Sequence, residues 1–123
     1  MAWLRRDGRA RVKAGNAAED CALAWLTARG LTLVERNHRC RQGEIDLIMR
    51  DGETLVFVEV RLRGSGAFGG AAASIDAHKQ RRIIAAARHF LAGRAETPCR
   101  FDCVLLDRID AAGIEWLRGA FEA

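Results

Sequence analysis

Two short apolar segments joined by an Asp-Gly pair constrain the fold of this 123-residue chain more than any other feature. Residues 44–50 and 54–63 are predicted strands, and the second segment is rich in β-branched residues, which favour β-strands. Asp51-Gly52 between them is a typical hairpin signal. The sequence therefore predicts an antiparallel β-hairpin inside a single domain, since compact domains usually need about 100–200 residues.

Helices and further strands are predicted on both sides of this hairpin. Apolar residues at helical spacing predict a helix over 15–30 and another over 74–91, the latter with Ser74 as its N-cap. Strands are predicted at 31–36 and 100–106, with a short strand or helical turn at 114–121. The order α-β-β-β-α-β predicts an α/β fold with a mixed central sheet flanked by helices.

Acidic residues interrupt the apolar strands of the hairpin. Glu44 and Asp46 lie in its first strand and Glu59 in its second, and a buried carboxylate is costly unless it has a partner. With Asp51-Gly52 as a two-residue loop, Glu44 faces Glu59 and Asp46 faces Phe57. Asp46 and Glu59 are then diagonal neighbours on one face, about 7–8 Å apart. A three-residue loop would instead place them on opposite faces.

This spacing of carboxylates indicates a divalent cation. Carboxylates that lie so close repel each other unless a cation or a proton lies between them. Oxygen ligands suit Mg²⁺ or Mn²⁺ better than zinc. Glu19 is a third candidate ligand, because it prolongs the apolar stripe of its helix toward the sheet. The alternative, equally open for Glu19, is a first-turn glutamate favoured by the helix dipole.

Positive charge is concentrated at the N-terminus. The chain has a net charge of +4, and residues 1–13 hold five basic residues against one acid, so the remainder is neutral overall. A basic arm suits a polyanion such as nucleic acid, whereas the alternative is a solvated, disordered tail. The candidate nucleic-acid-binding residues are Arg5, Arg6, Arg9, Arg11 and Lys13 in the arm, and Arg36, Arg63, Lys79 and Arg82 in the domain (residues 14–123). The three arginines of the domain fit solvated surface charges equally well.

Several motifs together resemble the YraN family of uncharacterised bacterial proteins. They span residues 13–118: Gly15-x3-Glu19, Arg36-Asn37, Gly43-Glu-Ile-Asp-Leu-Ile, Phe57-Val-Glu-Val-Arg-x-Arg63, Lys79 and Arg100-Phe-Asp102. The resemblance implies a restriction-endonuclease-like αβββαβ core, as in Holliday-junction resolvases and other PD-(D/E)xK nucleases. It implies a metal-dependent endonuclease that hydrolyses DNA phosphodiester bonds at branched or damaged structures. By analogy with resolvases it also implies a symmetric homodimer.

The resemblance assigns roles to individual residues. Asp46 and Glu59 become the motif acids that, with Glu19, hold Mg²⁺ or Mn²⁺. Arg61 stands where the motif has lysine, and an arginine can orient water or neutralise charge but cannot act as a general base. Lys79 could supply a lysine from the next helix. Because of Arg61, a catalytically inactive nucleic-acid-binding or scaffold protein is the alternative, and an interaction module that uses the sheet edge is a third hypothesis.

The remaining signals are weaker. No run approaches the roughly 20 apolar residues of a membrane span, and no apolar signal segment follows the N-terminus, so we expect a cytoplasmic protein with reduced cysteines. Zinc binding through His38-x-Cys40 or Cys99-x3-Cys103 is disfavoured, because no Cys-x2-Cys pair is present. Cys21 and Cys103 are expected in the core.

Overall fold

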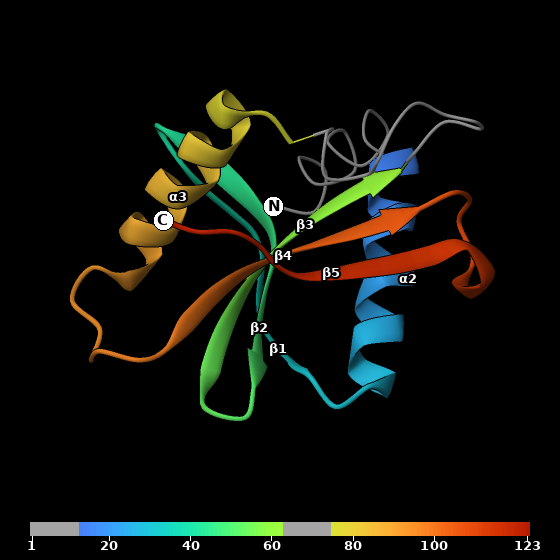
Figure 1. The fold of residues 1–123 in the computed structure, drawn as a ribbon, viewed down its shortest axis with the longest axis horizontal. Coiled ribbons are helices and arrows are strands. Elements are labelled where there is room, and N and C mark those ends of the chain that lie inside the picture. The colour runs from blue at the N-terminus through green and yellow to red at the C-terminus, as the bar shows by residue number, and fades with distance from the viewer. Residues whose placement is uncertain (1–12, 63–74) are drawn as a thin grey trace, which may run out of the picture.

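Five strands form one mixed sheet, and one long helix covers each of its faces (Figure 1). The computed structural model describes residues 13–62 and 75–123. The predicted α/β class, with a mixed sheet flanked by helices, is confirmed; the basic arm up to residue 12 lies outside the described residues. The elements in chain order are α2 (Lys13–Ala28), β1 (Thr32–Cys40), β2 (Gly43–Asp51), β3 (Thr54–Leu62), α3 (Ala77–Leu91), β4 (Cys99–Leu106), the 3₁₀ turn η2 (Ala111–Gly113) and β5 (Ile114–Phe121).

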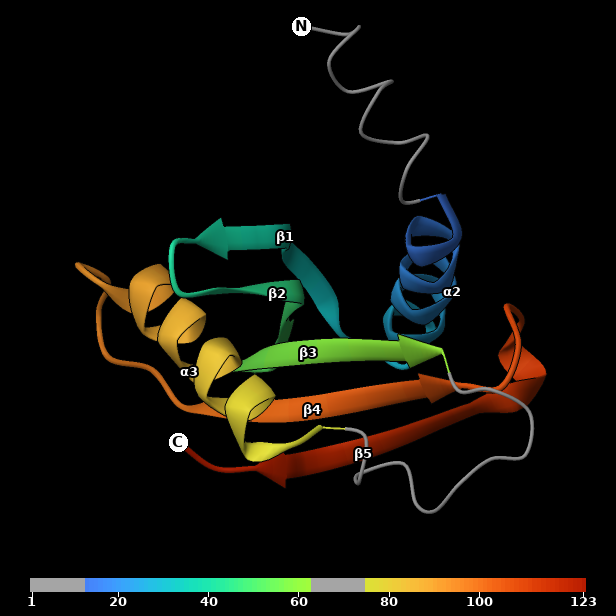
Figure 2. The same ribbon diagram turned by 90° about the horizontal axis from the view of Figure 1, so that it is seen from above.

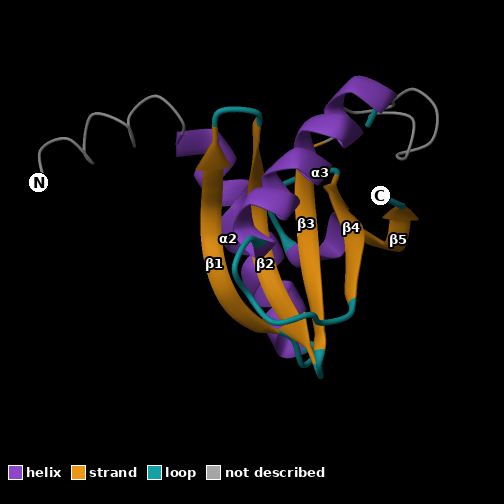
Figure 3. Ribbon diagram, turned by 90° about the vertical axis from the view of Figure 1, so that its left-hand side faces the viewer, coloured by secondary structure: helices purple, strands orange, loops and turns teal. Residues whose placement is uncertain are grey.

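The strands follow one another across the sheet in chain order (Figure 3). Every neighbouring pair is antiparallel except β3 and β4, which are parallel. A parallel pair needs a long crossover, and here the crossover contains α3. Figure 3 shows α3 on one side of the sheet and α2 on the other. The predicted final strand is present, preceded by the short turn η2.

The central hairpin forms, with a register two residues away from the predicted one. Asp51 pairs with Thr54 and Arg50 with Leu55, so the two-residue loop is Gly52-Glu53 rather than Asp51-Gly52. Gly52 takes a positive φ of 62°, which glycine adopts without the steric cost of a Cβ atom. The turn therefore begins at the glycine and not one residue earlier.

This shift changes which residues face each other. The predicted pairs Glu44 with Glu59 and Asp46 with Phe57 are wrong, because Phe57 lies opposite Ile48. A shift of two residues leaves each side chain on its face of the sheet. The pairing ends at Leu47 and Val58, next to Asp46 and Glu59.

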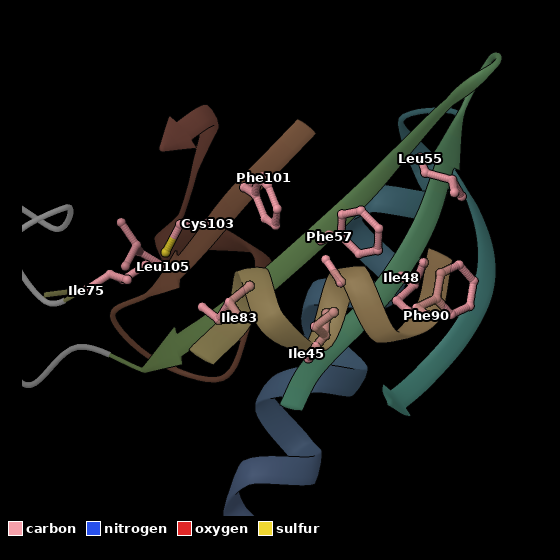
Figure 4. Packing of buried hydrophobic residues seen from close by; sticks show 12 residues of the cluster. Ile45, Ile48, Leu55, Phe57, Ile75, Ile83, Phe90, Phe101, Cys103 and Leu105 are labelled. Atoms are coloured by element: carbon pink, nitrogen blue, oxygen red, sulfur yellow. The ribbon is translucent and has the colours of Figure 1, made fainter. Parts of the chain in front are cut away.

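Two apolar clusters fill the space between the sheet and its helices. Ile83 and Phe90 of α3 pack on Phe57 of β3 (Figure 4), and Phe57 and Phe90 meet edge to face with ring centroids 6.1 Å apart. On the opposite face Leu26 of α2 packs against β2, β3 and β4. Cys103 is fully buried in the α3 cluster, as predicted.

Helix α3 begins later than predicted. Its N-cap is Asp76 and not Ser74, and the Asp76 carboxylate accepts a hydrogen bond from the backbone N–H of Lys79 at 2.8 Å. Such a cap satisfies one of the free N–H groups of the first turn. It also fixes the turn that carries the Lys79 side chain.

The Arg100-Phe-Asp102 motif has a structural role at the other edge of the sheet. Asp102 is fully buried and accepts hydrogen bonds from the Trp116 ring N–H and the Gly119 backbone N–H, both at 2.9 Å. Arg100 donates to the same carboxylate at 3.1 Å. Asp102 thus holds β5 onto β4, and the Trp116 ring packs edge to face on Trp25 of α2.

Candidate functional site

The β2 strand is distorted at Asp46. Backbone pairing with β3 ends at Leu47, and beyond it the Asp46 carboxylate accepts the Val60 backbone N–H at 2.8 Å. Ile45 and Leu47 pack in clusters on opposite faces of the sheet, so the usual alternation of side chains is interrupted between them. On the neighbouring strand β1, Asn37 takes a positive φ of 53° beside this point.

A hollow of about 280 Å³ lies beside this distortion. Figure 2 shows the C-terminal end of β3 reaching α2 here, with α3 crossing the other face of the sheet. Both helices and both hairpin strands contribute to its lining. Three carboxylates and two cations line it: Glu19 from α2, Asp46 from β2, Glu59 and Arg61 from β3, and Lys79 from α3. The structure therefore brings the predicted catalytic residues together.

Asp46 and Glu59 form the closest acidic pair of the hollow. Each carboxyl affects the pKa of the other, because both are buried side by side in the hollow. Burial, and next the charge of Glu59, raise the pKa of Asp46 to about 7. Burial also raises the pKa of Glu59, although Lys79 and Arg61 oppose this rise. Two carboxyls held this way take up a proton or a cation readily.

Two cationic side chains contact Glu59. Lys79 Nζ lies 3.4 Å from Glu59 Oε2, and Arg61 Nη1 lies 3.7 Å from the same oxygen. The Glu59 side chain is 5% exposed, whereas both cations remain about one-third exposed. The two cations are therefore more accessible to solvent than the acid that they contact.

Glu19 lines the same hollow from α2. Its side chain is 12% exposed and lies 3.3 Å from Arg36 Nη2, while Arg36 Nη1 lies 2.8 Å from Asp20. Burial, and next the charge of Asp46, raise the pKa of Glu19. Helix α2 begins at Lys13 and has no acid in its first turn, so the alternative of a first-turn glutamate favoured by the helix dipole is wrong for Glu19. Arg36 is engaged with two acids of α2 and is not a solvated surface charge.

The other candidate residues lie apart from the hollow. Arg82 is exposed on α3, and Glu44 pairs with Arg39 of β1 at 3.4 Å. The arm arginines and Arg63 fall outside the described residues, as does the side chain of Lys13. Over 13–62 and 75–123, no three His, Cys, Asp or Glu side chains are placed as a ready set of metal ligands.

Several long-range contacts were missed from the sequence, and two of them involve polar residues of β1. One is the Arg36–Glu19 pair. The other joins His38 of β1 to His89 of α3, with 3.1 Å between ring nitrogens 51 positions apart in the chain. The separation of the two residues along the sequence does not indicate a contact for either pair. The Cys40 thiol on the same strand donates to Gln42.

The sequence is similar to a family of bacterial proteins, which confirms the resemblance to the YraN family. The family model described as "Uncharacterised protein family UPF0102" matches residues 18–106. A UPF0102 protein of Nitrosomonas europaea is 59% identical over 109 residues, covering 88% of this chain and 92% of the relative. A UPF0102 protein of Alcanivorax borkumensis is 52% identical over 118 residues, covering 92% and 94%. The matched region includes every residue of the hollow.

Proposed function

The chain belongs to the uncharacterised protein family UPF0102, and we propose that it is a metal-dependent endonuclease that hydrolyses DNA phosphodiester bonds, at branched or damaged structures. The observation that carries this proposal is the contact between the buried Asp46 and Glu59 carboxyls beneath two cationic side chains. Buried acids provide ligands for a divalent ion, and the surrounding cations favour a phosphate at the same place.

The donor set of the hollow fits Mg²⁺ or Mn²⁺. These ions prefer carboxylate oxygen, and Mg²⁺ is commonly held by one or two carboxylates while substrate phosphates and water complete its shell. Asp46 and Glu59 would supply that pair, and Glu19 stays a candidate third ligand. A bound ion would stabilise charge on the scissile phosphate and lower the pKa of water.

The cations have a separate task in this proposal. Arg61 and Lys79 bind and orient the phosphate and offset the charge that develops during hydrolysis. An arginine does not act as a general base, so Arg61 cannot accept a proton from water. Lys79 lies in the first turn of α3. In this proposal it has the role that a lysine at position 61 would have.

The topology supports a finer assignment of the fold. We infer a restriction-endonuclease-like core from the order α2-β1-β2-β3-α3-β4, with a β2–β3 hairpin and a parallel β3–β4 pair around the acids. DNA as the partner follows from the charges of the hollow and from the basic arm. A homodimer stays a prediction from the resemblance to resolvases.

The alternative is an inactive nucleic-acid-binding or scaffold protein with the same fold. Arg61 favours it, because an enzyme that depended on a lysine at this position would have lost its proton acceptor. The two hypotheses differ in one respect: both predict salt-sensitive DNA binding, but only the first predicts cleavage that depends on the acid pair.

The test measures cleavage of four-way, flapped, single-stranded and linear duplex DNA with Mg²⁺, with Mn²⁺ and with a chelator. The wild type is expected to cleave at least one branched substrate only when metal is present. Asp46→Asn and Glu59→Gln should reduce cleavage to background, since each replaces a metal-binding carboxylate by a neutral group of the same shape.

Glu44→Gln is the matched control. Glu44 lies two residues from Asp46 on the same strand but pairs with Arg39 outside the hollow. This variant should cleave at the wild-type rate. Metal-independent cleavage, or equal cleavage by the wild type and Asp46→Asn, would refute the proposal. DNA binding without any cleavage would favour the inactive alternative.

A further inference from the structure

A histidine pair joins β1 to α3 away from the acidic hollow. His38 Nε2 lies 3.1 Å from His89 Nδ1, and His38 Nδ1 lies 2.8 Å from Glu35 Oε2. The His38 ring also meets the Phe90 ring edge to face, with centroids 5.4 Å apart. His38 is 13% exposed, whereas His89 is exposed. These contacts hold the His38 ring in place, whereas the His89 ring is accessible to solvent.

Glu35 determines which nitrogen of His38 carries the proton. A carboxylate only accepts hydrogen bonds, so Nδ1 of His38 is the donor and Nε2 of the neutral ring keeps its lone pair. His89 Nδ1 must then donate to that lone pair. When a metal ion enters between the rings, the proton on His89 Nδ1 is lost to solvent and His89 takes up one on Nε2, so that both facing nitrogens offer lone pairs.

We propose that His38 and His89 bind one Zn²⁺-type ion, with Glu35 supporting His38 from behind. Two nitrogens that coordinate one tetrahedral zinc at about 2.05 Å lie about 3.3 Å apart, close to the observed separation. A carboxylate on the second nitrogen of a ligating histidine is the usual supporting contact at such centres. His89 lies in the last turn of α3, where the helix dipole favours a cation.

The remaining coordination positions of this site would be open. Among the residues that the structure describes, no third His, Cys, Asp or Glu is arranged with these two as a ligand. Water, or an oxygen or nitrogen atom of a bound molecule, would fill those positions. Imidazole ligands select Zn²⁺, Ni²⁺ and Cu²⁺, whereas the carboxylates of the acidic hollow suit Mg²⁺. The two sites therefore differ in residues and in ion preference.

The test is calorimetric titration of the tag-free protein with Zn²⁺ in a buffer that does not chelate metals. The wild type is expected to bind one Zn²⁺ per chain. His38→Asn and His89→Asn should each weaken binding at least about tenfold, and Glu35→Gln about tenfold through loss of the supporting charge. Because His89 is exposed, His89→Asn is expected to retain the fold, which circular dichroism checks.

The chain supplies its own matched control. Its third histidine, His78, is exposed in the first turn of α3, so His78→Asn should bind Zn²⁺ within about twofold of the wild type. Asp46→Asn should also bind Zn²⁺ within about twofold of the wild type, which would show that the ion does not bind in the acidic hollow. With Cu²⁺ as probe, the electron paramagnetic resonance spectrum should show coupling to two nitrogens. Absence of Zn²⁺ binding, equal affinity of His38→Asn and His89→Asn with the wild type, or oxygen-only Cu²⁺ coordination would overturn the proposal.

Discussion

Replacing Asp46 by asparagine should stabilise the metal-free protein at alkaline pH. Asparagine has the shape of a protonated aspartate, so it can accept from the Val60 N–H and donate to Glu59 without carrying charge. The pKa of Asp46 is raised from 3.8 to about 7 by burial and by Glu59. Ionising this carboxyl in the folded protein is therefore unfavourable.

The pH dependence follows from the direction of this shift. Between pH 4 and pH 7 the folded protein retains a proton that the unfolded chain has lost, so the free energy of unfolding falls as the pH rises through this window. A shift of about three units at roughly 1.4 kcal/mol each corresponds to about 4 kcal/mol, part of which belongs to Glu59. We expect Asp46→Asn to be about 2–4 kcal/mol more stable than the wild type at pH 8 and equally stable below pH 4.

Urea unfolding at pH 4, 6 and 8 in the presence of a chelator measures this difference. Adding Mg²⁺ should stabilise the wild type by about 2.7 kcal/mol at 100 times the dissociation constant and leave Asp46→Asn unchanged. Glu44→Gln is the control, because this exposed acid lies outside the hollow and should show no pH-dependent gain. The reasoning would be refuted if Asp46→Asn were less stable than the wild type at pH 8. It would also be refuted if the difference in the free energy of unfolding were the same at all three pH values.

Four further outcomes are expected. Gly43→Ala should destabilise the fold by roughly 1–3 kcal/mol in urea unfolding, because the new Cβ would collide with the Arg82 carbonyl; an unchanged midpoint would contradict this packing. Asp102→Ala should cost roughly 2–4 kcal/mol by leaving the Trp116 and Gly119 N–H groups without their buried acceptor, and a loss under 1 kcal/mol would show that water replaces the carboxylate. Lys79→Met should slow DNA cleavage at saturating Mg²⁺ while Mg²⁺ still binds, and an unchanged rate would remove Lys79 from the mechanism. Deleting residues 1–12 should flatten the salt dependence of duplex binding by roughly 0.9 in slope per lost phosphate contact, and an unchanged slope would exclude the arm.

The meeting of Asp46 and Glu59 was predictable because both acids lie on one hairpin. The two segments pair with each other in either register, so a two-residue error does not separate the acids. The register itself was missed because either residue of Asp51-Gly52 could begin a two-residue loop. Only the backbone shows that Gly52, with its positive φ, is the first loop residue.

Contacts between distant elements could not be predicted in the same way. Arg36 binds Glu19 because β1 passes beside α2, and His38 meets His89 because α3 returns across the sheet to β1. Hydrophobic periodicity locates such elements but does not specify which polar residues they bring together. The distortion at Asp46 could not be predicted either, because the sequence of residues 44–50 predicts one regular strand.

The acids and the lysine of the hollow reach their places through loops of very different length. Asp46 and Glu59 are 13 positions apart on a local hairpin, which closes within microseconds in typical chains. Lys79 arrives only when the parallel crossover docks α3, a slower event because its loop is longer. During synthesis the two carboxyls and Arg61 therefore meet before Lys79 docks, and protons or divalent ions of the surrounding solution can occupy the place that Lys79 later takes.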